Sequence, residues 1–239
     1  MKNYAGPADS LYHTGLSAGR IRGAKYARVP GDPGRVEGLA KALDENALFV
    51  ASHRDYTSWL ARVENAPVLV MSTGMGGPCV TFAVEELARL GVETFIRVGT
   101  TGSIQEDLHL GDVVINTASV RMDGASRADA PIEFPAVADP DTVLALREAA
   151  EESGVPFKTG ISISTDSFWP GQERYDSFGG YVLKRLQGSL EDFRHIGCTN
   201  YEMENATLFT LCSVLGLKAA SICGVGARRT GGESVAPRD

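Results

Sequence analysis

Short apolar segments rich in β-branched residues recur along the chain, and this recurrence limits the possible folds more than any other feature. Such segments are typical of buried strands. Apolar residues at helical spacing fill several of the intervals between them. Strands that alternate with helices predict an α/β fold of three layers, with a mixed, largely parallel central sheet. The expected strands are residues 24–29, 67–72, 94–99, 112–120, 157–164 and 218–225.

Three of the intervals carry helix signals. The expected helices lie between Pro78 and Gly91, between Asp139 and Gly154, and from about Met203 to Leu215. Asp139 suits a helix N-cap, and the glycines suit the residue that follows a helix C-terminus. No linker, repeat or domain boundary interrupts the pattern. Residues 1–239 are therefore expected to form a single domain, with residues 123–135 as a surface loop.

Composition excludes several classes of function. The formal net charge is -7 and the 23 Lys and Arg residues are scattered, so no basic face for a nucleic acid is expected. The N-terminal residues contain no apolar run, and no segment nears the roughly 20 apolar residues of a membrane span. A cytoplasmic protein is expected. The four cysteines form no Cys-x-x-Cys pair, which indicates buried thiols rather than disulfides or a metal site.

Glycines and an arginine follow the first predicted strand, in the segment VPGDPGRV (29–36). Gly31 allows a sharp turn, and Arg35 is carried back over it. Ligands of open α/β sheets bind at the carboxyl ends of the strands, and a backbone amide beside a guanidinium suits a phosphate dianion. A Gly-Asp-Pro turn with a solvated arginine is the alternative.

Arg97 interrupts an apolar strand, where a charge is costly unless it is paired. A bound anion is one possible partner, and a buried carboxylate is the alternative. The strand leads into Thr100, Thr101 and Gly102, whose hydroxyls and amides can donate to an oxyanion. This segment is the stronger indication of a phosphate site.

The segment STDSFWPGQERYD (164–176) combines aromatic, amide and guanidinium side chains after a predicted strand. Phe168 can stack on a flat base, and Gln172 offers the donor and acceptor that an imide edge requires. Arg174 can meet a base carbonyl and stabilise negative charge that develops on it. A surface turn with exposed polar residues is the alternative.

Two carboxylates, Glu202 and Glu204, lie in NYEMENATL (200–208), at the expected start of the third helix. Helical positions two apart point in nearly opposite directions, so only one of the two can face a given pocket squarely. We assign Glu204 to accept hydrogen bonds from neighbouring sugar hydroxyls. The alternative is that both carboxylates interact with the helix N-terminus.

The segment STGMGGPC (72–79) is superficially similar to a dinucleotide-binding fingerprint. Its sixth position is Cys79 rather than Gly or Ala, and the nearest acid, Glu93, stands at the beginning of the next strand instead of its end. A dinucleotide site is therefore not expected. Close packing of a helix against the sheet explains these glycines.

Taken together, these segments resemble the uridine phosphorylases, within the hexameric nucleoside phosphorylase family. An ordered, nearly collinear set of motifs is far more specific than any one of them. The resemblance is carried by LYHTGL (11–16), VPGDPGRV, ASHRDYTSW (51–59), VMSTGMGGP (70–78), FIRVGTTGS (95–103), GDVVINTASVRMDGAS (111–126), FPAVAD (134–139), FWPGQERYD (168–176), NYEMENATL and RRTGGE (228–233).

The resemblance implies phosphorolysis of uridine to uracil and α-ribose 1-phosphate, with inorganic phosphate as co-substrate and no organic cofactor. Arg97, Arg174 and Gln172 are then expected to act in catalysis. The residues that it assigns are Gly31, Arg35, Arg97 and Thr100 to phosphate, with Arg54 of a neighbouring subunit; Thr101, Met203 and Glu204 to ribose, with His13 of that neighbour at the 5′-hydroxyl; and Gly102, Phe168, Gln172 and Arg174 to uracil.

Because two of these residues come from another chain, the resemblance implies an obligate dimer, assembled into a homohexamer as a trimer of dimers. Taken alone, His13 would be a solvated N-terminal residue and Arg54 a surface cation. The family also binds a monovalent cation such as K⁺ between subunits. The matching positions here are Asp55, Met75 and Cys79, and the shorter acid and the thiol disfavour that ion.

Other activities remain as alternatives. Purine-acting relatives place an acid in the segment that here reads GVGARRT (224–230), and no acid lies there. This absence favours a pyrimidine over the alternatives of a purine nucleoside phosphorylase or a water-using nucleosidase. A non-catalytic nucleoside-binding protein is a further alternative, against which the retained arginines count. The segment GARR (226–229) lacks the branched side chains that the family packs over the base, and the family's C-terminal helix is not expected within these 239 residues.

Overall fold

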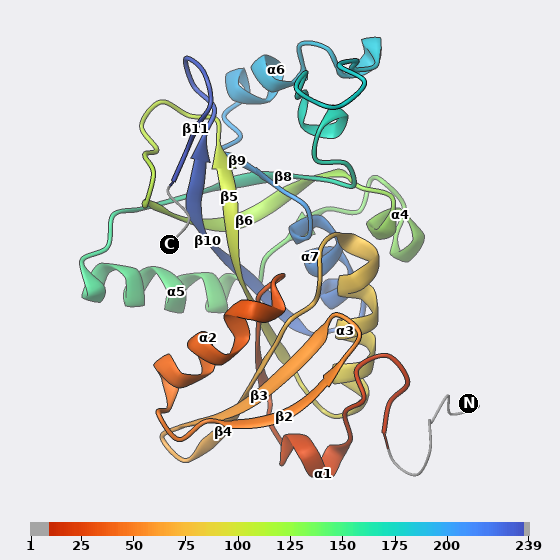
Figure 1. Ribbon diagram of the computed structural model, residues 1–239, viewed down its shortest axis with the longest axis vertical. Helices are drawn as coiled ribbons and strands as arrows, with labels where there is room; N and C mark the ends of the chain where they lie inside the picture. Colours follow the sequence, from red (N-terminus) through yellow and green to blue (C-terminus); the bar gives the residue numbers. More distant parts are fainter. Residues whose placement is uncertain (1–9, 237–239) are drawn as a thin grey trace.

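A computed structural model describes residues 10–236 of the chain, which form one continuous mixed sheet between two layers of helices (Figure 1). The strands are β1 Tyr26–Val29, β2 Leu48–His53, β3 Tyr56–Val63, β4 Ala66–Met71, β5 Thr94–Ser103, β6 Val113–Met122, β7 Ala136–Val137, β8 Phe157–Thr165, β9 Asn200–Glu202, β10 Lys218–Arg228 and β11 Ser234–Val235. The α-helices are α1 Ala18–Ile21, α2 Val36–Leu43, α3 Gly77–Arg89, α4 Ala125–Asp129, α5 Pro140–Ser153, α6 Ser189–His195 and α7 Asn205–Val214. Within this range no helix is both long and apolar enough to cross a bilayer.

Strand β5 is the junction of the sheet, because it pairs with β1, β9 and β10. On one side of β5 the sheet continues through β1, β4 and β3 to the edge strand β2. On the other side, β10, β6, β8 and β9 lead back to β5 in a closed circuit. The end of β5 is therefore surrounded by strands from distant parts of the sequence.

Helices cover the sheet on both faces, as the three-layer prediction requires. Helices α2 and α5 lie on one side, and α3, α4 and α7 pack together on the other (Figure 1). The largest apolar cluster joins residues of α3 and α7 to the strands, with Phe95, Leu87 and Phe209 among its fully buried members. Gly77 at the start of α3 is needed for this packing, because a Cβ there would lie 2.4 Å from Thr207 Oγ1 of α7.

The six predicted strands correspond to β1, β4, β5, β6, β8 and β10, and the predicted helices to α3, α5 and α7. The α/β class and the mixed sheet are confirmed. Parallel pairing joins β1 to both β4 and β5, β5 to β10, and β6 to β8. Most antiparallel pairings come from strands that were not predicted, above all the hairpin β2–β3.

The prediction of a surface loop over residues 123–135 is wrong in part. The segment contains α4, and its Asp123 and Ser126 are buried. The cause is the buried Arg121, whose guanidinium donates to the backbone oxygens of Ser126, Ala130, Pro131 and Phe134. One side chain thus satisfies carbonyls that would otherwise need water, and the segment folds inward around it.

The third helix begins later than predicted, at Asn205 instead of Met203. Residues 200–202 form the short strand β9, so Glu202 belongs to the sheet. Its carboxylate accepts from the backbone N–H groups of Glu204 and Asn205, both at 2.7 Å. The predicted interaction of an acid with the helix N-terminus is therefore made by Glu202 from outside the helix.

The cap of α5 gives a stability test that is independent of function. Asp139 accepts from Thr142 N at 2.9 Å and from Thr142 Oγ1 at 2.6 Å. Burial raises the pKa of Asp139, but these hydrogen bonds outweigh it and hold the pKa below its usual value. Asp139→Ala is expected to lower the free energy of unfolding by about 1 kcal/mol at pH 7, measured by urea denaturation.

Because the pKa of Asp139 is depressed by folding, the contribution of its charge is complete above its unfolded pKa of about 4 and is lost as the pH falls through the folded pKa. The difference in free energy of unfolding between wild type and Asp139→Ala should therefore shrink as the pH falls. Glu148→Ala, at an exposed position of the same helix, is the control and should change stability little. Equal effects of the two substitutions would contradict this account of the cap.

Candidate active site

The carboxyl ends of β1 and β4, together with the neighbouring middle part of β5, bring the first group of predicted residues together. Gly31 follows β1 and Gly74 follows β4, and Gly74 N donates to Gly31 O at 3.0 Å. Arg35 returns over the turn after β1, and its Nη1 donates to Val98 O of β5 at 3.3 Å. Arg97 stands in β5, in register with Val29 of β1 on one side and Ser221 of β10 on the other. The spatial grouping of Gly31, Arg35 and Arg97 follows from the parallel arrangement of β1 and β5.

Arg97 is buried, and its charge is balanced within the chain. Nη2 forms an ion pair with Glu204, and Nη1 donates to Cys223 Sγ at 3.0 Å. Burial alone would lower the pKa of Arg97, but the negative charge of Glu204 and smaller contributions from Cys223 and Glu202 raise it above its ordinary value. The chain itself thus supplies the buried carboxylate that was considered as a partner from sequence.

A glycine makes room for this guanidinium. A Cβ on Gly99 would lie 1.9 Å from Arg97 Nη1 and 3.0 Å from Cys223 Sγ. Any side chain there would displace Arg97 from the ion pair. The requirement for a glycine at this position is steric, since Gly99 does not have a positive φ.

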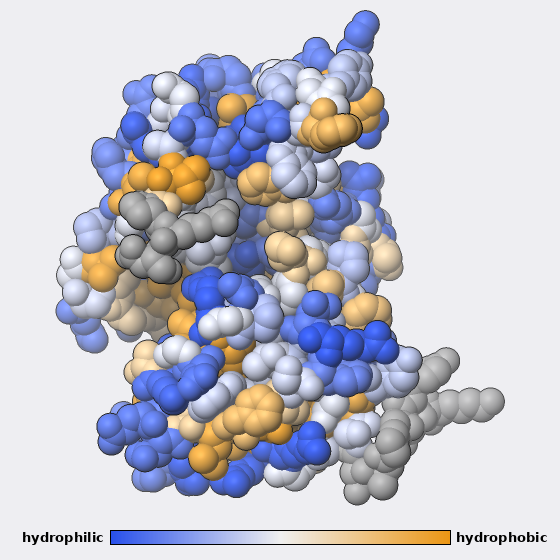
Figure 2. Space-filling view, viewed as in Figure 1, coloured by the Kyte–Doolittle hydropathy of each residue, from blue (hydrophilic) through white to orange (hydrophobic). Residues whose placement is uncertain are grey.

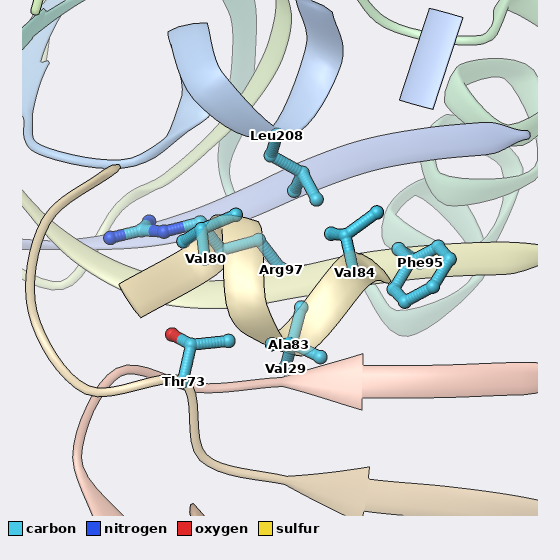
Figure 3. Close-up of a pocket in the computed structure, with 8 residues that line it drawn as sticks. All are labelled: Val29, Thr73, Val80, Ala83, Val84, Phe95, Arg97 and Leu208. Atoms are coloured by element: carbon cyan, nitrogen blue, oxygen red, sulfur yellow. The ribbon is translucent and has the colours of Figure 1, made fainter. Parts of the chain in front are cut away.

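Apolar side chains enclose the stem of Arg97. A crevice too narrow for a water molecule is lined by Val29, Thr73, Val80, Ala83, Val84, Phe95, Arg97 and Leu208. Figure 3 shows the guanidinium extending away from Val84 and Phe95, toward the end of the crevice where Thr73 lies. The low polarity of this wall strengthens the electrostatic interactions of the cation with groups at its open end.

Glu204 links Arg97 to the loop before α3. One of its oxygens pairs with Arg97, and the other accepts from Gly76 N at 2.7 Å. Met203 is half-buried beside it, and its backbone N–H donates to Glu204 Oε2 at 3.3 Å. Glu202, by contrast, is directed to Ser119, Ser162 and Ser164. The two carboxylates do face different surroundings, as predicted, although neither lies within the helix.

The two threonines after Arg97 differ in their exposure. Thr100 is exposed at the end of β5. Thr101 is buried, and its hydroxyl donates to Tyr201 O at 2.6 Å and accepts from Asn200 Nδ2 at 2.7 Å. The hydroxyl of Thr101 is thus engaged in the sheet contact between β5 and β9.

The residues predicted to read a base form a second group. The guanidinium carbon of Arg174 lies 4.2 Å from the centre of the Phe168 ring, and Arg174 Nε donates to Gln172 Oε1 at 3.4 Å. Gln172 and Arg174 are both buried, whereas Phe168 is partly exposed. A Cβ on Gly102 would lie 3.8 Å from Arg174 Nη2, so this glycine borders the same space.

Two members of the second group were not predicted. Glu233 forms an ion pair with Arg174 Nη1. Arg229 donates through Nη1 to Gln172 O at 2.8 Å, and burial together with the charge of Arg174 lowers its pKa. Both residues lie in RRTGGE, which contributed to the resemblance but was assigned no role. Their distance in sequence from Gln172 and Arg174 left no local signal of these contacts.

His13 and Arg54 do not join either group. Arg54 lies in the turn between β2 and β3, and its guanidinium carbon is 5.2 Å from the centre of the Tyr12 ring. His13 pairs with Glu86 on α3. Among the described residues, neither side chain forms a hydrogen bond or ion pair with Arg97, Glu204 or Arg174. Within one chain, the site is thus built without these two residues.

The residues matching the family's cation site converge only partly. A Cβ on Gly74 would lie 3.1 Å from Asp55 Cβ and 3.4 Å from Cys79 Sγ, so these two side chains meet at this glycine. Burial and the charge of Asp55 raise the pKa of the Cys79 thiol, which keeps it neutral. Met75 is largely exposed. A neutral thiol is a poor ligand for a hard cation, so these residues do not fit K⁺ well.

The surface above the strand ends is hollowed. Figure 2 shows a recess with hydrophilic side chains, between the part of the molecule that carries α6 and the part that carries α2 and strands β2 to β4. Strand β1 pairs in parallel with both β4 and β5, so the three strands run toward the same edge of the sheet. A recess at this edge of a sheet is the usual place for a small ligand in α/β proteins.

Comparison with known proteins agrees with these features. The model of the phosphorylase superfamily matches residues 25–237. The uridine phosphorylase of Escherichia coli is 50% identical over 222 residues, which cover 93% of this chain and 87% of the relative. The uridine phosphorylase of Thermococcus kodakarensis is 44% identical, covering 93% and 79%. The guanosine phosphorylase of Halorubrum lacusprofundi is 36% identical, covering 84% and 77%.

The ion pair between Arg97 and Glu204 can be tested by its coupling energy. Arg97→Met and Glu204→Gln are each expected to lower the free energy of unfolding by about 3 kcal/mol, because each leaves a buried polar partner unpaired. In urea denaturation at pH 7, the double variant should lose about 2 kcal/mol less free energy of unfolding than the sum of the two single losses.

The exposed pair of Glu37 and Lys41 supplies the control. Two single substitutions of this pair and their combination should give a coupling energy of no more than about 0.5 kcal/mol. Strictly additive effects of the Arg97 and Glu204 substitutions would show that the two charges do not stabilise one another.

Proposed function

We propose that this chain, which belongs to the phosphorylase superfamily, catalyses the phosphorolysis of uridine to uracil and α-ribose 1-phosphate. The observation that carries the proposal is the buried pair of Arg97 and Glu204 at the strand ends, in a chain 50% identical to a uridine phosphorylase. A cation and a carboxylate side by side match the two needs of the reaction. One holds the phosphate, and the other holds the sugar that the phosphate attacks.

Phosphate binds, in this proposal, between the turn after β1 and the end of β5. Gly31 offers a backbone amide, Thr100 an exposed hydroxyl, and Arg35 and Arg97 the positive charge. Arg97 Nη1 is bonded to the Cys223 thiol, which is a weak acceptor. It can therefore turn this donor to a phosphate oxygen at small cost while Nη2 stays with Glu204.

Ribose lies beside Glu204 and Met203. A carboxylate that accepts from two sugar hydroxyls fixes C1′ above the phosphate, so the attack becomes effectively intramolecular. Thr101 lines this region from below, with its hydroxyl already bound to Tyr201 O. As the glycosidic bond lengthens, the phosphate serves both as counter-ion to the sugar cation and as nucleophile.

Uracil is read by Phe168, Gln172 and Arg174, with Gly102 at the border of the same space. The departing base gains negative charge on its carbonyl oxygens, and Arg174 stabilises that charge. The contacts of Phe168 and Gln172 with Arg174 support this assignment, because they place a stacking ring, an amide and a cation within one cluster.

The purine alternative requires a protonated acid at the base. Residues 224–230 contain none, and the nearby Glu233 is paired with Arg174. An ion-paired carboxylate is an anion that accepts hydrogen bonds and does not supply a proton. The guanosine phosphorylase relative, at 36% identity, is also less similar to this chain than the uridine phosphorylases of Escherichia coli and Thermococcus kodakarensis. We therefore favour a pyrimidine substrate.

The proposed active unit is a dimer in which Arg54 and His13 of one subunit complete the site of the other, assembled as a homohexamer. The separation of both residues from the site within one chain supports this arrangement. The reaction needs no organic cofactor, and we route no step through K⁺. A cytoplasmic role in pyrimidine nucleoside salvage and catabolism completes the proposal and rests on the resemblance.

The direct test follows uracil release from uridine by ultraviolet absorbance, with and without phosphate. Release that requires phosphate and is accompanied by ribose 1-phosphate is the expected result. Release in water alone would identify a nucleosidase. Binding of uridine without turnover in either buffer would identify a nucleoside-binding protein, and preference for inosine or guanosine would identify a purine phosphorylase.

Two substitutions separate the proposed subsites in steady-state kinetics. Gln172→Ala is expected to raise the KM for uridine about tenfold and leave the KM for phosphate within about twofold, because it removes hydrogen bonds to the base alone. Arg97→Ala is expected to lower kcat by about 10²-fold or more, because it removes a charge from the phosphate and the transition state.

Gln187→Ala is the matched control for the amide, because Gln187 lies outside the base cluster and donates to Val182 O. Its kinetics should resemble those of wild type. A parallel loss of affinity for both substrates in Gln172→Ala would mean that the base site has been assigned to the wrong loop.

A further inference from the structure

Glu86 of α3 holds His13 through both its backbone and its side chain. Glu86 Oε1 accepts from His13 N at 2.9 Å and lies 2.7 Å from His13 Nδ1, while Oε2 accepts from Thr14 N at 2.8 Å. Burial raises the pKa of Glu86, but these hydrogen bonds outweigh it, and the net pKa is below the usual value. The partner of His13 is therefore a carboxylate.

The ring of His13 is also fixed by aromatic neighbours. It stacks on Phe82 with ring centres 4.1 Å apart and an angle of 22°, and Tyr12 meets it edge-on at 5.0 Å. The side chain of His13 keeps 30% of its surface exposed. One face and one nitrogen of the ring are thus held by the chain, while another part remains accessible.

A carboxylate at Nδ1 determines what the second ring nitrogen can do. A carboxylate only accepts hydrogen bonds, so Nδ1 carries a proton. In the neutral imidazole, Nε2 is then an acceptor, and no hydrogen bond to Nε2 occurs within the described residues. Glu86 therefore presents Nε2 as an acceptor suited to a hydroxyl group.

The contacts of His13 with α3 hold it away from the site of its own chain. Val80, Ala83 and Val84 of α3 line the crevice around Arg97. Phe82 and Glu86 are four residues apart and lie together on a different face of the helix. At ~100° per residue, that face is about 130° from the face that lines the crevice. His13 stacks on Phe82, so it lies on the side of α3 that is turned away from the Arg97 crevice.

We propose that Glu86 is a positioning residue that, through His13, sets recognition of the 5′-hydroxyl of the nucleoside in the neighbouring subunit's site. This inference rests on the proposed function and on the dimer proposed with it. Glu86 does not touch the substrate; it fixes the tautomer and the orientation of the imidazole that does. The specificity of one active site thereby depends on a buried acid of α3 in another chain.

Glu86 also anchors the segment around Thr14, so a structural role must be separated from positioning. The comparison of uridine with 5′-deoxyuridine does this, because the two substrates differ only in the hydroxyl that His13 is proposed to meet. A structural defect would affect both substrates alike. A positioning defect would affect only the substrate that carries the hydroxyl.

Glu86→Gln is expected to lower kcat/KM about tenfold for uridine and less than about twofold for 5′-deoxyuridine, since only uridine carries the hydroxyl that His13 is proposed to bind. In a His13→Ala background, adding Glu86→Gln should change kcat/KM for uridine by less than about twofold. Glu85→Gln is the matched control, because Glu85 is a neighbouring, half-buried acid that pairs with Arg89 instead of His13. It should leave both substrates unaffected.

Equal losses for the two substrates, unchanged kinetics for both, or a further tenfold loss in the His13→Ala background would each overturn the positioning role. These outcomes are distinct from failure of the proposed function, in which wild-type protein would not phosphorolyse uridine at all. Thermal unfolding of the purified variants, followed by circular dichroism, shows whether a parallel loss comes from unfolding of the chain.

Discussion

The buried ion pair between Arg97 and Glu204 is the interaction on which the rest of the site depends. Removing an arginine from water is costly, and the cost is offset only when a carboxylate and further hydrogen bonds meet it with good geometry. Those conditions require elements from distant parts of the chain. Strand β5 supplies Arg97, the β9–α7 turn supplies Glu204, β10 supplies Cys223, and the loop before α3 supplies Gly76 N. The pair therefore joins the closed part of the sheet to the helical layer.

Helix α3 connects this pair to the proposed assembly. Its apolar side, with Val80 and Val84, forms the wall that keeps the stem of Arg97 dry. Its outer side, with Phe82 and Glu86, holds His13 at the surface. One helix thus supports the anion site of its own chain and, in the proposed dimer, the sugar site of the next. This double use gives a physical reason why a single chain should not be fully active.

The strands and helices that carry the site could be predicted, because their apolar patterns are local. The register of β1 beside β5 then brings Gly31, Arg35 and Arg97 together, as expected for strand ends in an α/β sheet. The hairpin β2–β3 was missed because its strands are half exposed and less apolar. The inward folding of residues 123–135 depends on the single side chain of Arg121, which no pattern of those residues reveals.

The partners of the charged residues were harder to predict than their positions. Arg97 was expected to need either an anion or a carboxylate, and only the fold brings Glu204 to it across more than one hundred residues. The same holds for Glu233 and Arg229 beside Arg174. Such contacts are long-range consequences of topology. A sequence therefore indicates which residues can carry the chemistry, while the fold decides how their charges are balanced.

The most direct measurement is a crystal structure with phosphate and a non-cleavable uridine analogue bound. The account predicts electron density for phosphate against the guanidinium of Arg97 and the backbone of Gly31, with Glu204 accepting from the ribose hydroxyls. Phosphate bound elsewhere, with Arg97 engaged only by Glu204 and Cys223, would contradict it.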